Sequence, residues 1–187
     1  MVDESIAVLR ARVLSLPADL KAMFAVVDDP ELSDELRLTG AAAIFYYLNP
    51  ANLIPSKEGM LGLADDAIAL RCALDEVQRG APDRAKRLAE HAPEAWAGLE
   101  REIELLSGLL GDLWGPVCEA WRAVGLLEWH GKSAKACVSD PEDSAWLYAA
   151  VDEALSTRDI DEQAVLREVK KEPLLSKLQQ RLATRKR

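Results

Sequence analysis

The stretch from Tyr46 to Asp66, YYLNPANLIPSKEGMLGLADD, decides the fold of this chain. It begins inside a run of almost uniformly apolar residues, Gly40 to Leu48, which is typical of a helix at the centre of a protein. Pro50 and Pro55 cannot continue that helix and fix their own φ angles, so they predict a stiff loop. An apolar stripe with helical spacing resumes near Leu63. The sequence therefore predicts two central helices joined by a tight reversal.

The loop itself contains residues with expected structural roles. Leu53 and Ile54 are apolar, and we expect both side chains to be buried against the two helices. Asn52 is suited to bonding nearby backbone groups in an Asx-turn. If the second helix starts near Leu63, Asp65 and Asp66 lie in its first turn, where a carboxylate stabilises a helix by roughly 0.3–1 kcal/mol. We therefore expect these two aspartates to cap the helix.

Apolar residues recur at intervals of three and four through most of the remaining chain, and Ala, Leu, Glu and Arg are abundant. This pattern predicts an all-α fold, an irregular bundle of seven to nine helices. The stretch 129–139 lacks a helical period. Residues 126–130 and 134–138 are candidates for one small β-hairpin, spanning 126–138, around Gly131-Lys132.

Helix-breaking residues suggest a division into three units. Gly80-Ala81-Pro82 interrupts the helical pattern, and a second irregular region extends from Gly131 to Pro141. We predict an N-terminal helical unit over 1–80 that contains the hairpin of helices, a middle helical pair over 81–131, and a C-terminal helical unit with a basic tail over 132–187.

Charge is unevenly distributed along the chain. The net charge of −9 argues against nucleic acid as a partner. Residues 164–187 carry eight Lys or Arg and two Glu, a net charge of +6, which leaves −15 on the rest. This basic segment either folds against the chain's own acidic body or binds a partner.

Cysteine usage and hydropathy indicate the compartment. Cys72, Cys118 and Cys137 are odd in number and widely spaced, so no disulfide framework or zinc pattern is expected. The N-terminus lacks a secretory profile, and no apolar run approaches the roughly 18–20 residues of a spanning helix. We therefore expect a cytoplasmic protein.

The loop segment resembles the YkvA-type family, a domain of unknown function (DUF1232), over roughly residues 36–77. Asn49, Pro50, Leu53, Ile54 and Pro55 match the family's Pro-x-Asp-Leu-Ile-Pro turn, and Gly62, Asp65 and Asp66 match its Gly-x-x-Asp-Asp. Two family acids are replaced here, by Asn52 and Ser56. The family has no established activity, so the resemblance implies a helical hairpin and no particular function.

One candidate site for chemistry is a cation site. Asp65, Asp66, Asn52 and Glu58 offer the oxygen ligands that Mg²⁺ and Ca²⁺ prefer. Adjacent helical residues point about 100° apart, however, so two neighbouring aspartates rarely bind one ion. A cryptic metal-dependent hydrolase centred on Asp65 and Asp66 is therefore an alternative, and the expected protein has no catalytic residue, metal or other cofactor.

The leading prediction is a non-enzymatic adaptor or regulatory subunit that binds another protein. Trp129 lies in the least regular stretch, and aromatic residues are enriched in the cores of interfaces. Lys177, Arg181 and Arg185 on the basic last helix are further candidates for partner contacts. A third alternative is peripheral membrane association, in which Tyr46 and Tyr47 sit at the membrane surface.

Overall fold

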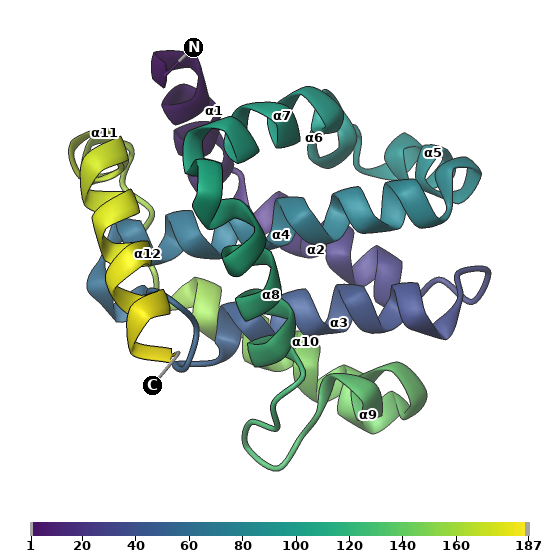
Figure 1. The fold of residues 1–187 in the computed structure, drawn as a ribbon. Coiled ribbons are helices and arrows are strands. Elements are labelled where there is room, and N and C mark those ends of the chain that lie inside the picture. Colours follow the sequence, from purple (N-terminus) through teal and green to yellow (C-terminus); the bar gives the residue numbers. More distant parts are fainter. Residues whose placement is uncertain (1, 186–187) are drawn as a thin grey trace.

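The computed structural model describes residues 2–185. These residues form helices connected by short loops (Figure 1). The α-helices are α1 (Val2–Leu14), α2 (Leu16–Val27), α3 (Asp34–Leu48), α4 (Met60–Gly80), α5 (Pro82–His91), α6 (Pro93–Trp96), α7 (Leu99–Leu110), α8 (Trp114–Gly125), α9 (Ala134–Ser139), α10 (Pro141–Ser156), α11 (Glu162–Glu168) and α12 (Lys171–Arg185). Two 3₁₀ turns, η1 (Ser56–Glu58) and η2 (Gly111–Leu113), lie between them.

The expected all-α, irregular multi-helix fold is confirmed. Helices α3 and α4 form its centre and run side by side through the molecule (Figure 1). Every residue of α3 from Gly40 to Leu48 is buried, because α2, α4, α8 and α9 all pack against this helix. The backbone of α8 comes especially close. A Cβ atom on Gly125 would lie 2.2 Å from the carbonyl oxygen of Ala42.

Side-chain caps fix several helix starts. The Ser33 hydroxyl accepts a hydrogen bond from the Leu36 N–H at the start of α3. Asp140 and Asp161 do the same at the starts of α10 and α11. Each such cap satisfies a backbone N–H that the helix leaves unpaired, and is worth about 1 kcal/mol.

The expected β-hairpin over 126–138 is wrong. Residues 2–185 contain no strand, and the region holds a single antiparallel bridge between Trp129 and Lys132. The turn lies at His130 and Gly131, which have φ angles of 52° and 70°. Ser133 then caps α9 by accepting from the Ala136 N–H, so the second half of the predicted hairpin is helical.

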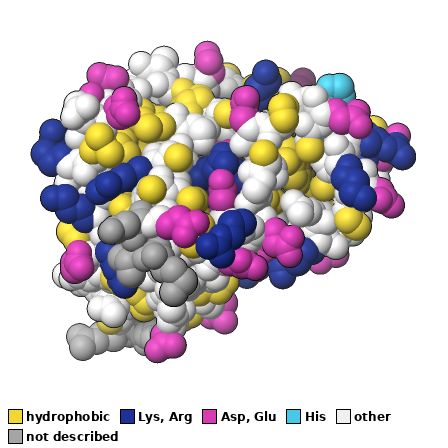
Figure 2. Space-filling view, turned by 90° about the horizontal axis from the view of Figure 1, so that it is seen from above, with side chains coloured by type: hydrophobic (Ala, Val, Ile, Leu, Met, Phe, Trp, Pro, Cys, Tyr) yellow, Lys and Arg dark blue, Asp and Glu magenta, His cyan; other side chains and the backbone are white. Residues whose placement is uncertain are grey.

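One contiguous hydrophobic core contains buried residues from the ranges 1–80, 81–131 and 132–187. Within the described part of the chain, no helix is long and apolar enough to cross a membrane. On the face shown in Figure 2, acidic and basic side chains are interspersed.

Candidate functional site

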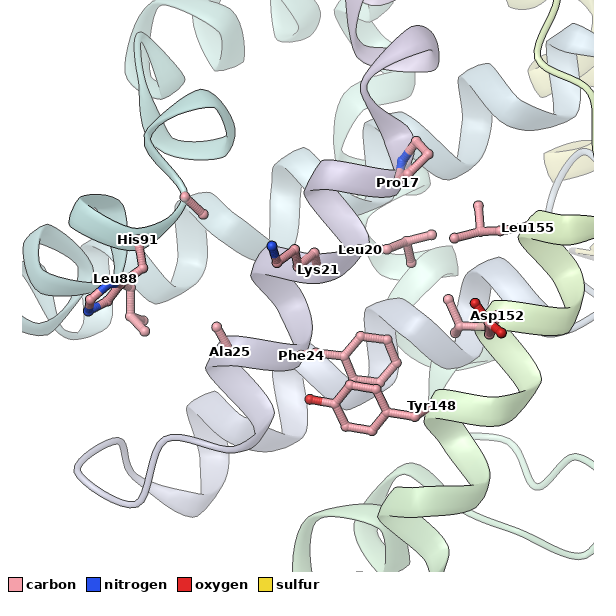
Figure 3. A pocket seen from close by; sticks show the side chains of 12 residues that line it. Pro17, Leu20, Lys21, Phe24, Ala25, Leu88, His91, Tyr148, Asp152 and Leu155 are labelled. Atoms are coloured by element: carbon pink, nitrogen blue, oxygen red, sulfur yellow. The ribbon is translucent and has the colours of Figure 1, made fainter.

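An apolar groove lies between α2, α5 and α10 (Figure 3). Its volume is about 430 Å³, which falls in the range of ligand and side-chain binding pockets. The rings of Phe24 and Tyr148 stack at its centre, with centroids 3.8 Å apart and planes inclined by 15°. The lining side chains are Pro17, Leu20, Lys21, Phe24, Ala25, Leu88, His91, Ala92, Tyr148, Val151, Asp152 and Leu155.

The walls of the groove follow from helical periodicity. Leu20 and Phe24 are four residues apart and share one face of α2. Tyr148, Asp152 and Leu155 share one face of α10 in the same way. None of these lining residues was predicted from the sequence to belong to a site.

Tyr148 is a large aromatic side chain that lies partly exposed in this groove. Its side chain is 40% exposed, and its hydroxyl donates a hydrogen bond to a carboxylate oxygen of Asp28. Partial burial, and then that carboxylate, raise the pKa of the Tyr148 phenol above its ordinary value. The phenol is therefore neutral, and an apolar aromatic surface faces the groove.

Polar side chains border the groove on both sides, with a lysine on one side and an aspartate on the other. Lys21 on α2 and His91 at the end of α5 lie on one side, and Asp152 on α10 lies on the other (Figure 3). All three are exposed. Among the described residues none of the three takes part in an ion pair. A ligand with an apolar centre and opposite charges at its two edges would match this arrangement.

The two aspartates of the predicted cation site are in the interior. Helix α4 begins at Met60, earlier than expected, so Asp65 and Asp66 lie in its second turn. Both are buried, with exposed fractions of 1% and 0%. The expectation that they cap the helix from its first turn is therefore wrong, since they do not reach the free N–H groups of the helix start.

Their carboxylates instead bind the loop and α3. Asp65 Oδ2 accepts a hydrogen bond from the Tyr46 hydroxyl at 2.5 Å and from the Ile54 N–H at 3.0 Å. Asp66 Oδ1 accepts from Asn52 Nδ2 at 2.9 Å. Asn52 therefore bonds a side chain of α4. These bonds hold the reversal between α3 and α4 in place.

Burial also changes the charge state of this pair. It raises the pKa of Asp65 to about 6, although hydrogen bonds from Tyr46 and Ile54 oppose the rise. It raises the pKa of Asp66 well above its usual range, and the neighbouring Asp65 carboxylate adds to the effect. Asp65 Oδ1, Asp66 Oδ2 and Asn52 Oδ1 accept no hydrogen bond. A hard cation needs charged oxygen ligands, and Asp66 favours its neutral form.

Glu58 lies apart from that pair. Its carboxylate forms ion pairs with Arg181 and, at 2.6 Å, with Lys177, and these cations lower its pKa. Within residues 2–185, no group of three or more His, Cys, Asp or Glu side chains is arranged to hold a metal ion.

The basic last helix contacts the same loop. Lys177 and Arg181 of α12 bind Glu58, and a guanidinium nitrogen of Arg185 donates to the Ala51 carbonyl. The charged ends of the three basic candidates therefore contact the chain itself. Of the two alternatives for the basic segment, the structure has the one in which it folds against the chain's own body.

Trp129 is half-buried. Its ring contacts His130, with centroids 4.2 Å apart, and Trp146, with centroids 5.8 Å apart. It also borders a second hollow of about 500 Å³ between the α8–α9 connection and the loop after α3, together with Lys57 and Arg158. Leu126 and Leu127, both more than half exposed, begin the same connection, which extends away from the helical body (Figure 1).

A comparison of the chain with protein-family models, with curated proteins and with solved structures finds no match. The resemblance of residues 36–77 to the YkvA-type family (DUF1232) therefore stays a prediction.

Proposed function

We propose that this protein is a non-enzymatic, cytoplasmic adaptor or regulatory subunit that binds a helical segment of another protein. The site of binding is the groove between α2, α5 and α10. The observation that carries the proposal is the apolar lining of this groove around the stacked rings of Phe24 and Tyr148. Grooves between packed helices bind the apolar face of an amphipathic partner helix.

The charges at the border of the groove define the chemistry of the partner. Lys21 favours an acidic residue on one edge of the bound helix, and Asp152 favours a basic residue on the other. Between these residues the partner would place apolar side chains at positions i, i+3 and i+4, which occupy one helical face. The partner is therefore an amphipathic helix with apolar anchors and edges of opposite charge.

The free thiol state of all three cysteines supports a reducing compartment.

Tyr148 supports binding, because tyrosine contributes a large contact area with only two rotatable bonds and is enriched in interface cores.

The proposal is tested by selecting peptides from a displayed library of amphipathic helices and measuring their affinity by fluorescence polarisation. Ala25 is exposed and lines the groove, so Ala25→Arg places a long charged side chain in it without removing a core contact. Ala123, exposed on α8 outside the groove, provides the matched control Ala123→Arg.

Selected peptides should lose at least about tenfold in affinity to the Ala25→Arg protein, equivalent to about 1.4 kcal/mol. They should bind the Ala123→Arg protein normally. Lys21→Glu should shift the selected peptides from an acidic to a basic residue on that edge. Peptides that bind the two arginine variants equally well, or a library that yields no binder, would refute the proposed site.

A further inference from the structure

Two cysteines far apart in the sequence meet between α4 and α8. Cys72 Sγ and Cys118 Sγ are 3.6 Å apart, although 46 residues separate them along the chain. Cys72 is buried and Cys118 is half-buried. The third cysteine, Cys137, lies elsewhere and donates from its thiol to the Asp143 carbonyl at 3.3 Å.

We propose that Cys72 and Cys118 form a peroxide-reactive dithiol, in which Cys118 is the residue that attacks a hydroperoxide and Cys72 closes a disulfide between α4 and α8. The sulfur contact carries this assignment. A disulfide has an S–S distance of about 2.05 Å, so the two sulfurs must approach by about 1.5 Å from their present 3.6 Å. Rotation of the two side chains, with a small shift of the helices, covers that distance.

The surroundings of the two thiols assign their roles. Cys118 is the more accessible, and its pKa is lowered by a hydrogen bond from the Cys72 thiol and by the guanidinium of Arg122. Arg122 is held there by an ion pair with Glu76 and by a 3.2 Å hydrogen bond to the Cys118 carbonyl. Arg79 also lowers the Cys118 pKa, whereas Glu76 opposes it.

Cys72 has the opposite character. Its hydrogen bond to Cys118 and its burial raise its pKa well above the usual range. Thiolate nucleophiles that sense oxidants are accessible, have a low pKa and lie beside a resolving cysteine. Cys118 therefore fits the role of the thiolate that reacts with the oxidant, and Cys72 fits the role of the resolving cysteine.

The reaction balances without any group beyond the peroxide. The Cys118 thiolate attacks one oxygen of hydrogen peroxide, the O–O bond breaks, and hydroxide leaves and takes up the proton that Cys118 released, which gives one water and a sulfenic acid on Cys118. The Cys72 sulfur then attacks the Cys118 sulfur, and the S–O bond breaks. The hydroxyl leaves with the Cys72 proton as water. Two thiols are oxidised to one disulfide and one peroxide is reduced to two waters.

The test treats the full chain with hydrogen peroxide and measures intact mass, free thiols in denaturant, and digested peptides by mass spectrometry. The wild-type monomer should lose two hydrogen atoms, its free thiols should fall from three to one, and one peptide pair should link Cys72 to Cys118. Cys137→Ser should behave in the same way.

Two further variants separate the roles. Cys72→Ser should leave a sulfenic acid on Cys118 that dimedone traps, whereas Cys118→Ser should react at least tenfold more slowly and trap nothing at Cys72. The linked peptide in the wild-type digest keeps the test valid if a serine variant does not fold. Cross-links between chains, a linkage through Cys137, or a Cys118 sulfinic acid beside a free Cys72 would overturn the proposal.

Discussion

The hydroxyl of Tyr46 donates a 2.5 Å hydrogen bond to Asp65 across the reversal between α3 and α4. The same hydroxyl accepts from the Leu53 N–H at 2.9 Å, so one phenol satisfies both a carboxylate and a loop amide. Both side chains are buried. A buried polar group that loses its partner costs about 1–3 kcal/mol, and this pair therefore stabilises the loop through groups that water cannot replace.

Tyr46→Phe should destabilise the protein by roughly 1–3 kcal/mol, because it leaves the Leu53 N–H without a partner and the Asp65 carboxylate with one hydrogen bond fewer. Tyr47 provides the matched control, since it is the adjacent buried tyrosine and its hydroxyl bonds neither a carboxylate nor a loop amide. Tyr47→Phe should lower the free energy of unfolding by less than half as much as Tyr46→Phe does. Urea unfolding of both variants measures the difference, and equal losses would contradict the role given to the Tyr46 hydroxyl.

The raised pKa of Asp65 predicts a dependence of stability on pH. Its pKa is about 6 in the folded protein, against 3.8 for an ordinary aspartate, so the folded state holds the proton more tightly than the unfolded state. This contribution is fully present below about pH 4 and is lost as pH rises through 6. The free energy of unfolding should fall in that window by at most about 1.4 kcal/mol per pH unit from this one group.

Asp65→Asn isolates this effect. An amide oxygen can accept from both Tyr46 and Ile54 and does not titrate. Urea unfolding from pH 4 to 7 measures this effect. The free energy of unfolding of the variant should rise relative to that of the wild type as pH increases from about 4 to 6. The raised carboxyl of Asp19 is present in both proteins and cancels in the difference, whereas Asp66 loses the part of its raised pKa that the Asp65 carboxylate causes. Parallel curves would show that folding does not raise the pKa of Asp65.

Arg71 is a fully buried cation on α4. Its guanidinium lies 3.1 Å from Asp19 and 3.2 Å from Glu102, and donates to the Ala95 carbonyl at 2.7 Å. Arg71→Met should cost about 3–5 kcal/mol, because buried Asp19 then keeps only the more distant Arg12, 3.7 Å away, as a charge partner. Arg101→Met removes two exposed ion pairs and should cost far less than Arg71→Met, because exposed pairs contribute little to stability.

A double variant tests the reason for that loss. Asp19→Leu with Arg71→Met removes both buried charges, and should recover most of the stability that Arg71→Met alone loses. Thermal and urea unfolding of the single and double variants measure this recovery. If the double variant is as unstable as the single one, packing by the arginine stem rather than charge explains the loss.

Local sequence signals predicted the helical class and the central reversal. Prolines and apolar periods act over a few residues, so the end of α3 at Leu48 and the irregular loop after it could be read directly. The burial of Leu53 and Ile54, which are 1% and 0% exposed, confirms their expected place in the core. The positions of these elements could be predicted because the prolines and the apolar spacing that determine them lie within the sequence of each element.

The charged interior could not be predicted in the same way. An aspartate near a helix start is ordinarily exposed, and Asp65 is buried only because Tyr46, 19 residues earlier, and the Ile54 amide supply its hydrogen bonds. Arg71 lies on a helix whose apolar residues gave no sign of a buried cation. Its acidic partner, Asp19, is 52 residues away. Such pairs arise from tertiary packing.

The groove has the same origin. Phe24 and Tyr148 stack although they belong to α2 and α10, at opposite ends of the sequence. Within its own helix, each of the two residues occupies a position typical of a side chain that packs in the core. Only the way in which α10 packs beside α2 leaves their rings facing an open groove.

Gly62 connects the loop sequence to the start of α4. A Cβ atom at this position would lie 2.6 Å from Ser56 Cα and 2.7 Å from the Pro55 carbonyl oxygen. Both are backbone atoms of the η1 turn, whose Pro55 carbonyl already accepts from the Glu58 N–H at 2.8 Å. The turn therefore packs against α4 at a separation that only glycine permits, and Gly62→Ala should cost roughly 1–3 kcal/mol.

Gly108 provides the matched control, because it lies inside α7 and a Cβ atom there would meet nothing within 4 Å. Gly108→Ala should stabilise the protein by about 0.5–1 kcal/mol, since alanine restricts the unfolded chain and favours helix. The two identical substitutions should thus shift the urea midpoint in opposite directions. A gain in stability from Gly62→Ala would mean that the turn does not press against α4, and that the order of residues from Pro55 to Gly62 is not what sets the reversal.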